Sequence, residues 1–547
     1  MDKKTVLAVV LSFLVFLVWS LLFGPKPSDQ QPERASSPKK EEPQQTVAPE
    51  TRKPLGPQRE TLLDAASPEK DIAVETELYS AVFSGSGPMI KGFKLKQYRS
   101  TTEKGSQLKE LIHVNNKEGC GFNLGFSGKT LPNMNWSSST VQRQDIVLTR
   151  EDQPKELIYE WKSPQGVDMQ TRFIFHPEQY NIDLDVTVNN GSDYLVNDAL
   201  SLHLAHLPRG IKKSYGVFEG MALLLGGELE EIKANKIEDK KFTGRIAWAA
   251  YEEPYFMKAI ANENDAGITV KGTTLPSGEI RVSYLSSPLN MKPLEKTTKH
   301  FTLYFGPRDL YVLKELGKEL EKAINFGWFD VIAKPLLVTL RFFNNYLSNY
   351  GLSIIVLTIL IKILFWPLTH KSYQSMKEMR KLQPMMAKIR EKYKNNKQEM
   401  QKQLMNLYKT YKINPMGGCL PMVIQIPVFF AFYRILPSSI ELRHAPFVLW
   451  INDLSAPERL FSFPFKIPFM APPCGIPVLT LLMGASMFLQ QKMTPSPGDP
   501  TQAKIMMVLP IVFTFIFVNF PSGLVLYWLV NNLLSIAQQY RINRQVG

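Results

Sequence analysis

The spacing of apolar residues divides the chain into two kinds of sequence. Across 71–325, apolar and polar residues alternate with a period of two, most clearly at 182–188. The runs 157–161 and 169–175 flank the turn-forming residues 163–166. Such alternation is typical of β-strands with one buried face. Many strands of this kind in succession predict an antiparallel β-sandwich domain at 71–325.

Six long apolar runs predict membrane-spanning helices. The first is uncharged over 5–23, which at about 1.5 Å per residue reaches about 28 Å, close to the hydrocarbon thickness of a bilayer. No small-residue cleavage site follows it, so 1–24 is predicted to be an anchor rather than a signal peptide. The other predicted spans are 350–370, 418–436, 475–491, 504–520 and 523–540.

Three connecting segments have other compositions. Residues 25–70 are rich in Pro, Gln, Ser, Lys and Glu, which predicts a flexible linker. Residues 326–349 are amphipathic and aromatic, which predicts a helix in the membrane interface. Residues 371–417 have apolar positions at helical spacing on two stretches interrupted at 395–396, which predicts a helical hairpin.

Methionines form much of the apolar stripe of this predicted hairpin, at Met376, Met379, Met386 and Met400. One interpretation is that the stripe only holds the two arms together. Methionine also suits adaptable apolar contacts, so a surface that receives varied hydrophobic chains is the other interpretation. The sequence leaves both open.

The distribution of positive charge predicts the orientation in the membrane. The chain carries 64 Lys and Arg against 50 Asp and Glu, and 371–417 holds many Lys and Arg but only three Glu. Basic loops stay on the cytoplasmic side. Both termini, the hairpin, the loop 492–503 and the tail 541–547 are therefore predicted to be cytoplasmic, and 71–325 and the loop 437–474 to lie outside. The basic face of the hairpin could meet lipid headgroups or ribosomal RNA.

Composition and motifs exclude several classes of protein. With 44% apolar and 21% charged residues, the chain as a whole is not disordered. Its three cysteines lack CxxC or CxxH spacing, which argues against zinc ribbons and disulfide scaffolds. No GxxxxGK[ST], GxSxG or HExxH motif occurs. These absences predict that the chain does not hydrolyse ATP, whereas a protein that is no enzyme and needs no cofactor or metal is implied only by the family resemblance given below.

Lys362 is the most informative residue because it lies inside an apolar run. It precedes Lys371 by nine residues, which places it about 13 Å from the cytoplasmic end of its helix. A central lysine costs about 2.5–3.5 kcal/mol on insertion scales. No other predicted span contains an acidic residue to pair with it. It is either a snorkelling lysine in a tilted helix or the lining of a water-filled cavity open to the cytoplasm.

Polar residues at helical spacing favour the cavity. Thr358, Lys362, Trp366 and Thr369 fall on one helix face, and the last span has a stripe of Trp528, Asn531, Ser535 and Gln538. Gln425 adds a polar group in the third span. Each of these residues alone could simply form a hydrogen bond that holds two helices together. Together with an unpaired cation, they predict a shared hydrophilic groove.

Two pairs in the β region are weaker candidates. His203 and His206 are separated by an odd offset, so a strand would point them to opposite faces. Asp183 and Asp185 share a face, but they are predicted to lie on the solvated side of their strand.

Several stretches of the sequence resemble those of a known protein family. The runs FWPLTHKSYQSMKEMRKLQPMMAKIREKY, NPMGGCLPMVIQIPVFFAFY, ELRHAPFVLWINDLS and FPSGLVLYWLVNNLLSIAQQ, with the N-terminal MDKKTVLAVVLSFLVFLVW, resemble the YidC/Oxa/Alb family of membrane insertases in its Gram-negative form. The likeness covers the anchor and nearly everything after about residue 325. The β region agrees with that family's large periplasmic domain in position and size.

The resemblance implies a multi-pass inner-membrane protein with a periplasmic β domain, a cytoplasmic helical hairpin and a groove closed toward the periplasm. It implies insertion and folding of nascent membrane proteins, alone or with the Sec translocon and its SecDF accessory complex. Family members usually carry arginine in the groove of the second span, where this chain has Lys362. Tyr527 and Trp528 match a pair of substrate-contacting aromatic residues, and Thr358 matches another contact position.

Two other functions remain as alternatives. An ion or solute transporter would use Lys362 as a gating charge, but paired intramembrane acids and an inverted repeat are not evident. A mutarotase-like enzyme on an anchor would need a cleft with His and carboxylates in acid/base positions. Its six spans and hairpin would then be superfluous.

Overall fold

The computed structural model describes residues 70–113, 121–126, 129–130, 137–138, 145–163, 165–208, 217–262, 266–411, 413, 420–494 and 500–544. The chain divides into two compact units, 1–65 and 66–547, and the described residues all belong to the second. The predicted anchor 1–24, nearly all of the linker 25–70 and residues 495–499 of the loop 492–503 therefore lie outside the described residues.

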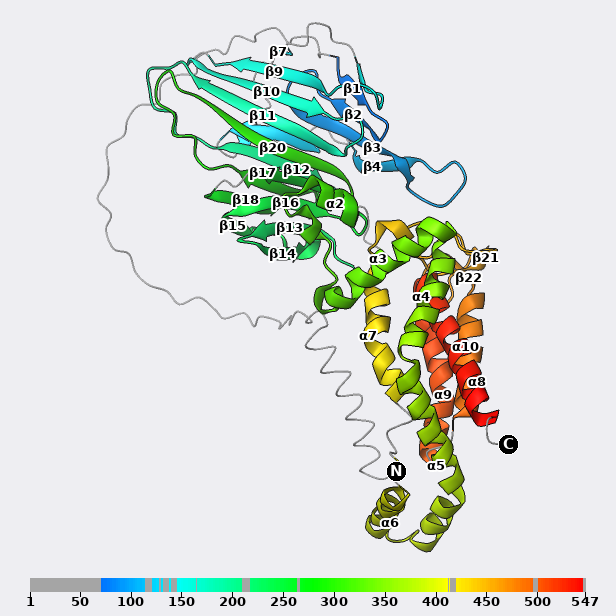
Figure 1. Cartoon of the computed structure of the whole chain (residues 1–547). Helices are drawn as coiled ribbons and strands as arrows, with labels where there is room; N and C mark the ends of the chain where they lie inside the picture. Colours follow the sequence, from blue (N-terminus) through cyan, green and yellow to red (C-terminus); the bar gives the residue numbers. More distant parts are fainter. Residues whose placement is uncertain are drawn as a thin grey trace, which may run out of the picture. The chain divides into compact units, whose positions relative to one another are not determined.

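Two large sheets make up the N-terminal part of the second unit (Figure 1). Among the described residues, the first sheet has 11 strands. Nine follow one path, in the order β15 (Lys241–Gly244), β18 (Ile268–Thr274), β19 (Ile280–Leu285), β12 (Leu200–His206), β5 (Phe122–Phe126), β3 (Met89–Arg99), β2 (Tyr79–Phe83), β1 (Ile72–Glu75) and β8 (Ile146–Val147). Beside this path, β4 (Leu108–Ile112) pairs with β3 and β6 (Lys129–Thr130) with β5.

The second sheet has nine strands within the described part of the chain. Their order is β14 (Glu228–Lys233), β13 (Gly220–Leu225), β16 (Ile246–Glu252), β17 (Phe256–Asn262), β20 (Lys296–Pro307), β11 (Asn181–Asn190), β10 (Val167–Phe175), β9 (Lys155–Lys162) and β7 (Ser137–Ser138). A short 3₁₀ helix, η1 (Ala234–Lys236), follows β14.

The alternation of the sequence explains how the two sheets pack. Along β10 every second residue is buried, and this face carries Phe173 and Phe175. Phe83 of the other sheet meets their rings edge-on, with centroids 5.1 and 5.3 Å away. Edge-to-face contacts of this kind stabilise the core beyond the area they bury. The prediction of a β-rich domain is confirmed.

One ion pair lies inside this domain. The guanidinium of Arg308 is 2.9 Å from a carboxylate oxygen of Glu252, and the two side chains are 6% and 0% exposed. Arg308 also donates to the backbone carbonyls of Glu253, Pro254 and Ala323. These bonds compensate the loss of water around the buried cation.

The C-terminal part is helical. Its elements are α2 (Leu310–Leu316), η2 (Leu320–Ala323), η3 (Gly327–Phe329), α3 (Asp330–Leu347), α4 (Tyr350–Leu364), α5 (Trp366–Lys392), α6 (Lys397–Thr410), α7 (Leu420–Ile435), η5 (Ile440–Leu442), α8 (Val478–Met493), α9 (Pro500–Phe517) and α10 (Ser522–Arg544). Helix α10 packs against both α4 and α8, and α8 against α9 (Figure 1). Between α8 and α9 the approach is close, because a Cβ on Gly484 would lie 2.1 Å from the Thr514 hydroxyl oxygen.

A bend divides the helix expected at 350–370. Helix α4 ends at Leu364, and α5 begins at Trp366 with an axis turned by 67°. Pro367 lies in the first turn of α5, where its missing N–H is tolerated and its ring disfavours a straight continuation from the preceding turn. Helix α5 therefore contains both the end of the predicted second span and the first arm of the predicted hairpin.

The described helices differ in length and in how apolar they are, and a helix that crosses a bilayer must be both long and apolar. Taken singly, none of them is both long and apolar enough to cross one; α4 and α5 pass that test only as a bent pair, and Val423–Ile435 and Lys504–Phe517 are shorter apolar stretches.

The break between α5 and α6 has a local cause. The interruption at 395–396 ends in Asn396, whose side chain accepts a hydrogen bond from the backbone N–H of Glu399 at 3.1 Å and so caps α6.

The loop after α7 contains a small hairpin that the sequence pattern did not predict. It consists of β21 (Leu460–Phe463) and β22 (Cys474–Ile476), and its register is irregular.

Candidate functional site

Lys362 lies on the face of α4 that packs against α10. Its ammonium donates a 2.6 Å hydrogen bond to the hydroxyl of Ser535 and a longer one, of 3.4 Å, to the side-chain carbonyl of Asn531. The side chain is only 8% exposed. Ser535 and Asn531 are one turn apart on α10, so the helical spacing of the sequence brings both to the same cation.

The ammonium has no acidic counterion nearby. Among the residues that the structure describes, no carboxylate oxygen lies within 4.0 Å of it. Its two partners are neutral groups that supply lone pairs but no charge. The site therefore holds a net positive charge between two helices. Burying an unpaired charge in this way lowers the stability of the protein.

The polar contacts continue toward α5. The amide of Gln538 donates to the hydroxyl of Thr369 at 3.1 Å, and both side chains are buried. Ser535 donates its own proton to the backbone carbonyl of Asn531 at 2.8 Å, which leaves its oxygen lone pair directed to Lys362. Lys362, Asn531, Ser535, Thr369 and Gln538 thus form a polar seam along α4, α5 and α10.

Other residues predicted for the groove lie apart from this seam. Thr358 is 1% exposed, and its hydroxyl donates to the carbonyl of Ile354 in its own helix at 2.6 Å. Tyr527 is also 1% exposed, and its ring stacks on Phe432 with centroids 4.6 Å apart. Gln425 is half-buried on α7. In this conformation Thr358 and Tyr527 belong to the packing between helices.

Trp528 belongs to an aromatic cluster. Its ring centroid is 4.9 Å from Phe429 of α7, and 5.3 Å and 6.2 Å from Phe517 and Phe513 of α9. The three helices therefore present a mainly apolar, aromatic wall one turn from the polar seam. Such a wall can contact an apolar helix without requiring specific polar partners.

The methionines of the predicted hairpin have different surroundings. Met376 is buried with Tyr373 and Ile542 of α10. Met386 is 2% exposed and accepts a contact from the hydroxyl of Tyr408 of α6, 3.7 Å from its sulfur. Met379 and Met400 are half-buried. Met376 and Met386 thus pack α5 against its neighbours, while Met379 and Met400 keep part of their surface open.

A second polar face of α10 did not stand out in the sequence. Asn532 donates to the hydroxyl of Ser486 on α8 at 3.0 Å, and Gln539 to the carbonyl of Met493 at 2.9 Å. These residues follow Asn531 and Gln538 by one position, so they face the opposite neighbour. The doublets Asn531-Asn532 and Gln538-Gln539 were the available signal that both faces of this helix are polar.

Comparisons with known proteins match the two parts of the chain separately. Residues 71–339 match a family described as the YidC periplasmic domain, and residues 342–547 match one described as 60Kd inner membrane protein. A protein of Pelobacter propionicus named "Membrane protein insertase YidC" is 41% identical over 557 residues, covering 100% of both chains. The chain belongs to the YidC family.

A second relative agrees with this assignment. A protein of the same name from Geobacter sulfurreducens is 40% identical over 551 residues, covering 100% of this chain and 99% of its own. A crystal structure titled as an active YidC insertase with its first transmembrane domain resolved is 19% identical, covers 87% of this chain and 93% of its own, and superposes with a TM-score of 0.37. The two family matches meet within α3, between residues 339 and 342.

Proposed function

We propose that this chain inserts and folds integral inner-membrane proteins. The observation that carries the proposal is the buried ammonium of Lys362, whose hydrogen-bond partners in the described part of the chain are the neutral groups of Ser535 and Asn531. A purely structural cation would be expected to have an acidic partner. An ammonium without one is available to attract an acidic residue of a segment that is being translocated.

The mechanism is physical rather than chemical. The polar seam lowers the cost of bringing a polar tail or loop part-way into the membrane, because it replaces some of that segment's lost water. Lys362 attracts acidic residues there, where the low dielectric strengthens the attraction. The aromatic wall around Trp528 then contacts the apolar helix of the substrate, whose transfer into lipid supplies the driving force.

The arrangement in the membrane is part of the proposal. It has six spans, with 1–24 as the first, both termini and the α5–α6 hairpin in the cytoplasm, and the β domain in the periplasm. Helix α3 supports an interfacial position, since Trp328, Val331 and Tyr346 at or near it are 88%, 84% and 75% exposed. Large apolar side chains on one short helix are suited to the headgroup region.

The proposed partners rest on the family resemblance and, for the ribosome, also on the basic composition of the hairpin. Nascent membrane proteins occupy the groove, lipids surround it, and the Sec translocon with SecDF acts with the chain on some substrates. The basic hairpin is the surface offered to a ribosome. Deleting 380–410 is expected to impair insertion more than deleting most of 75–300. The reverse ranking would move the function into the β domain.

The decisive experiment changes the charge of Lys362. Two single-span substrates that differ only in an acidic or a neutral translocated tail are inserted into proteoliposomes containing the full chain. Lys362→Ala is expected to slow the acidic-tail substrate several-fold more than the neutral one, and Lys362→Arg to support both. Lys371→Ala, which removes an exposed lysine one bend away, is the matched control. Equal insertion of both substrates by the Ala variant would remove the charge from the mechanism.

A photocrosslinker tests where the substrate lies. Because Thr358 is buried against its own helix, the half-buried Gln425 and Trp528 are the better positions. Crosslinks that form only while a chain is emerging from the ribosome support the groove. Intact insertion without crosslinks at either position would place the route elsewhere.

A further inference from the structure

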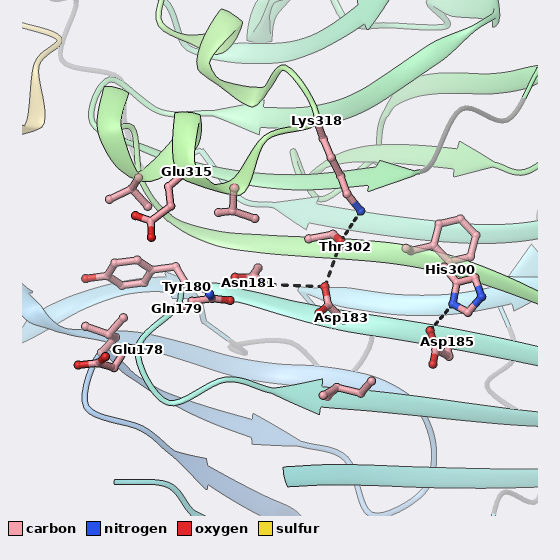
Figure 2. A pocket seen from close by; sticks show the side chains of 15 residues that line it. Glu178, Gln179, Tyr180, Asn181, Asp183, Asp185, His300, Thr302, Glu315 and Lys318 are labelled. Carbon is pink, nitrogen blue, oxygen red and sulfur yellow. Dashed lines mark hydrogen bonds and ion pairs between the residues drawn. The ribbon is translucent and has the colours of Figure 1, made fainter. Parts of the chain in front are cut away.

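Two cavities of the molecule differ in whether their charged groups already have partners. The larger, of about 710 Å³, lies over β11 and β20 in the β domain (Figure 2). There Asp183 accepts a hydrogen bond from Thr302, and Asp185 pairs with His300 and Arg172. Asp185 is therefore 9% exposed and ion-paired, which corrects the prediction that it lies on a solvated face. Because these carboxylates already have partners, they leave little for a ligand to bind.

The second cavity, of about 510 Å³, is a groove in the helical part. It is lined by one face of α8, one face of α9 and the loop that precedes α8. The lining side chains are apolar apart from Thr514, whose hydroxyl donates to the carbonyl of Pro510 in its own helix at 2.7 Å. A cavity of this size is within the range of ligand sites, and these walls suit an apolar ligand.

The rim of the groove consists of large apolar side chains that are open to the surroundings. Phe469 of the loop is 89% exposed, and Phe515 of α9 is 67% exposed. Exposed apolar surface of this kind marks contact with another apolar molecule or with a membrane. In the proposed membrane arrangement, this surface meets the acyl chains of the bilayer.

The length of the groove matches one leaflet. It follows α8 from the N-cap Pro477 to Phe488, a rise of about 16 Å at about 1.5 Å per residue. Half of the hydrocarbon core of a bilayer is about 15 Å. Since the loop before α8 is proposed to lie outside the cytoplasm, the groove would run from the outer surface of the membrane to near its midplane.

The loop wall is held in place by Asn519, which follows α9. Its amide nitrogen donates to the carbonyl of Phe469 at 2.7 Å, and its side-chain oxygen accepts from the N–H of Ala471 at 2.7 Å. Phe469 itself has a φ of 63°, a conformation that a bulky residue adopts only when its surroundings impose it. The two bonds therefore keep an exposed aromatic ring at the edge of the groove.

The outer end of the groove carries positive charge. Arg459 donates to the carbonyl of Val518, a lining residue, at 2.9 Å, and Lys466 is exposed in the lining loop. In the part of the chain that the structure describes, neither cation has a carboxylate oxygen within 4.0 Å. The stretch 459–477 contains no Asp or Glu, and both oxygens of the buried Glu458 already accept hydrogen bonds. An anionic group at this end therefore meets two cations that lack an acidic partner.

We propose that this groove binds one acyl chain of a phospholipid with net negative charge in the outer leaflet, with Arg459 and Lys466 at its phosphate. The apolar walls, the length of one leaflet and the cations at the outer end are the three features that such a lipid combines. The proposal rests on the proposed membrane arrangement of α8 and α9, but it does not involve Lys362 or the transfer of a substrate.

The test is photocrosslinking of the full chain in phosphatidylcholine nanodiscs without any substrate. One probe is a phosphatidylglycerol with a diazirine midway along one acyl chain, and the other is a phosphatidylcholine with the same chain. Labelled residues are mapped by mass spectrometry. We expect labelling of α8 and α9 to concentrate on the groove, and the anionic probe to label it about two- to fivefold more than the neutral one.

The other outcomes separate this proposal from the membrane arrangement beneath it. Uniform labelling of every exposed face of α8 and α9, or equal labelling by the two probes, overturns the lipid site and leaves the arrangement intact. Absence of labelling from both helices overturns the arrangement as well. Loss of the groove labelling when a ribosome-bound nascent single-span protein is added overturns the proposal in favour of a substrate helix as the occupant.

Variants assign the labelling to the groove. Ala485→Trp fills it from an exposed position of α8 and should remove most of the labelling, whereas Leu489→Trp, at an exposed position outside the lining, should not. Lys466→Gln should reduce the preference for the anionic probe, and Lys504→Gln, near the opposite end of α9, should leave it unchanged. Wild-type labelling in Ala485→Trp would place the acyl chain elsewhere.

Discussion

The two parts of the molecule each bury a cation, but the groups that surround the two cations differ in charge. Arg308 in the β domain is 6% exposed and meets the carboxylate of Glu252 as well as three backbone carbonyls. Lys362 in the helical part is 8% exposed and, within the described ranges, meets only a hydroxyl and a side-chain amide. Similar burial therefore coexists with an acidic partner in one part and, among the described residues, with no acidic partner in the other.

Under the proposed function, the difference is one between a structural charge, Arg308, and a charge that binds substrate, Lys362. The bonds of Arg308 tie β16 and β20 to the chain around Ala323, so that removing it would leave several buried groups unpaired. Lys362 ties α4 to α10 through bonds that neutral side chains could replace. A cation kept where it does not maximise stability is the signature expected of a binding surface.

The largest expected effect is that of Arg308→Met. It leaves the buried Glu252 and three carbonyls without their partner, which should destabilise the β domain by about 3–5 kcal/mol. Hydrogen exchange of 246–262 in the full chain measures the change. Arg150→Met, at an arginine 70% exposed in the same domain, should have little effect. Equal protection in Arg308→Met and wild type would show that the ion pair is dispensable.

The same substitution in the helical part should act in the opposite direction. Lys362→Met removes an uncompensated charge and should leave the helices as stable as before or more stable, by up to about 3 kcal/mol, while insertion of acidic-tail substrates falls. Thermal unfolding in detergent, followed by exchange in α4 and α10, measures stability. A clear loss of stability would mean that Lys362 is a structural cation like Arg308.

A smaller effect is expected for the partner of Lys362. Ser535→Ala removes the nearest acceptor of a buried ammonium and should destabilise α4 against α10 by about 1–3 kcal/mol. In a double-mutant cycle, the Ala change should have almost no effect once Lys362 is Met. Additive effects would instead show that Ser535 acts through packing.

The smallest effect concerns pH in the β domain. Burial raises the pKa of Glu252 to about 7, against the opposing charge of Arg308. The native state then holds a proton that the unfolded chain releases near pH 4.5. The stability it contributes is present below that value and lost as the pH rises through about 7.

Exchange protection of β16 and β17, corrected for intrinsic rates, should therefore fall by about 1 kcal/mol between pH 6 and 8. Glu252→Gln should flatten this dependence. An unchanged slope in the Gln variant would assign the titration to another group.

Much of this molecule follows from local sequence pattern. The period of two around 182–188 predicts strands, and β11 (Asn181–Asn190) has that alternation in register with β10. The stripe of Asn531, Ser535 and Gln538 predicts a polar helix face, and the first two of these meet Lys362. Patterns of this kind depend only on neighbours in the chain and on the geometry of one element.

Other features depend on residues that are distant in sequence. The bend at Phe365, the pairing of Glu252 with Arg308, and the burial of Asp185 by Arg172 and His300 could not be predicted from periodicity. Thr358 is predicted to line the groove by its spacing and Tyr527 by the family resemblance, yet each is packed inside the helices. Whether a polar side chain faces a partner, a cavity or its own helix depends on what the neighbouring element brings to it.

The sequence by itself determined the kind of molecule: a β-rich domain, apolar helices, and a lysine within one of them that lacks an acid in any other predicted span. Only the tertiary structure decided which charges are compensated. Hydrophobic periodicity is a one-dimensional property that each segment carries alone. Compensation of a buried charge requires two groups within a few ångströms, and that distance exists only after the segments have packed.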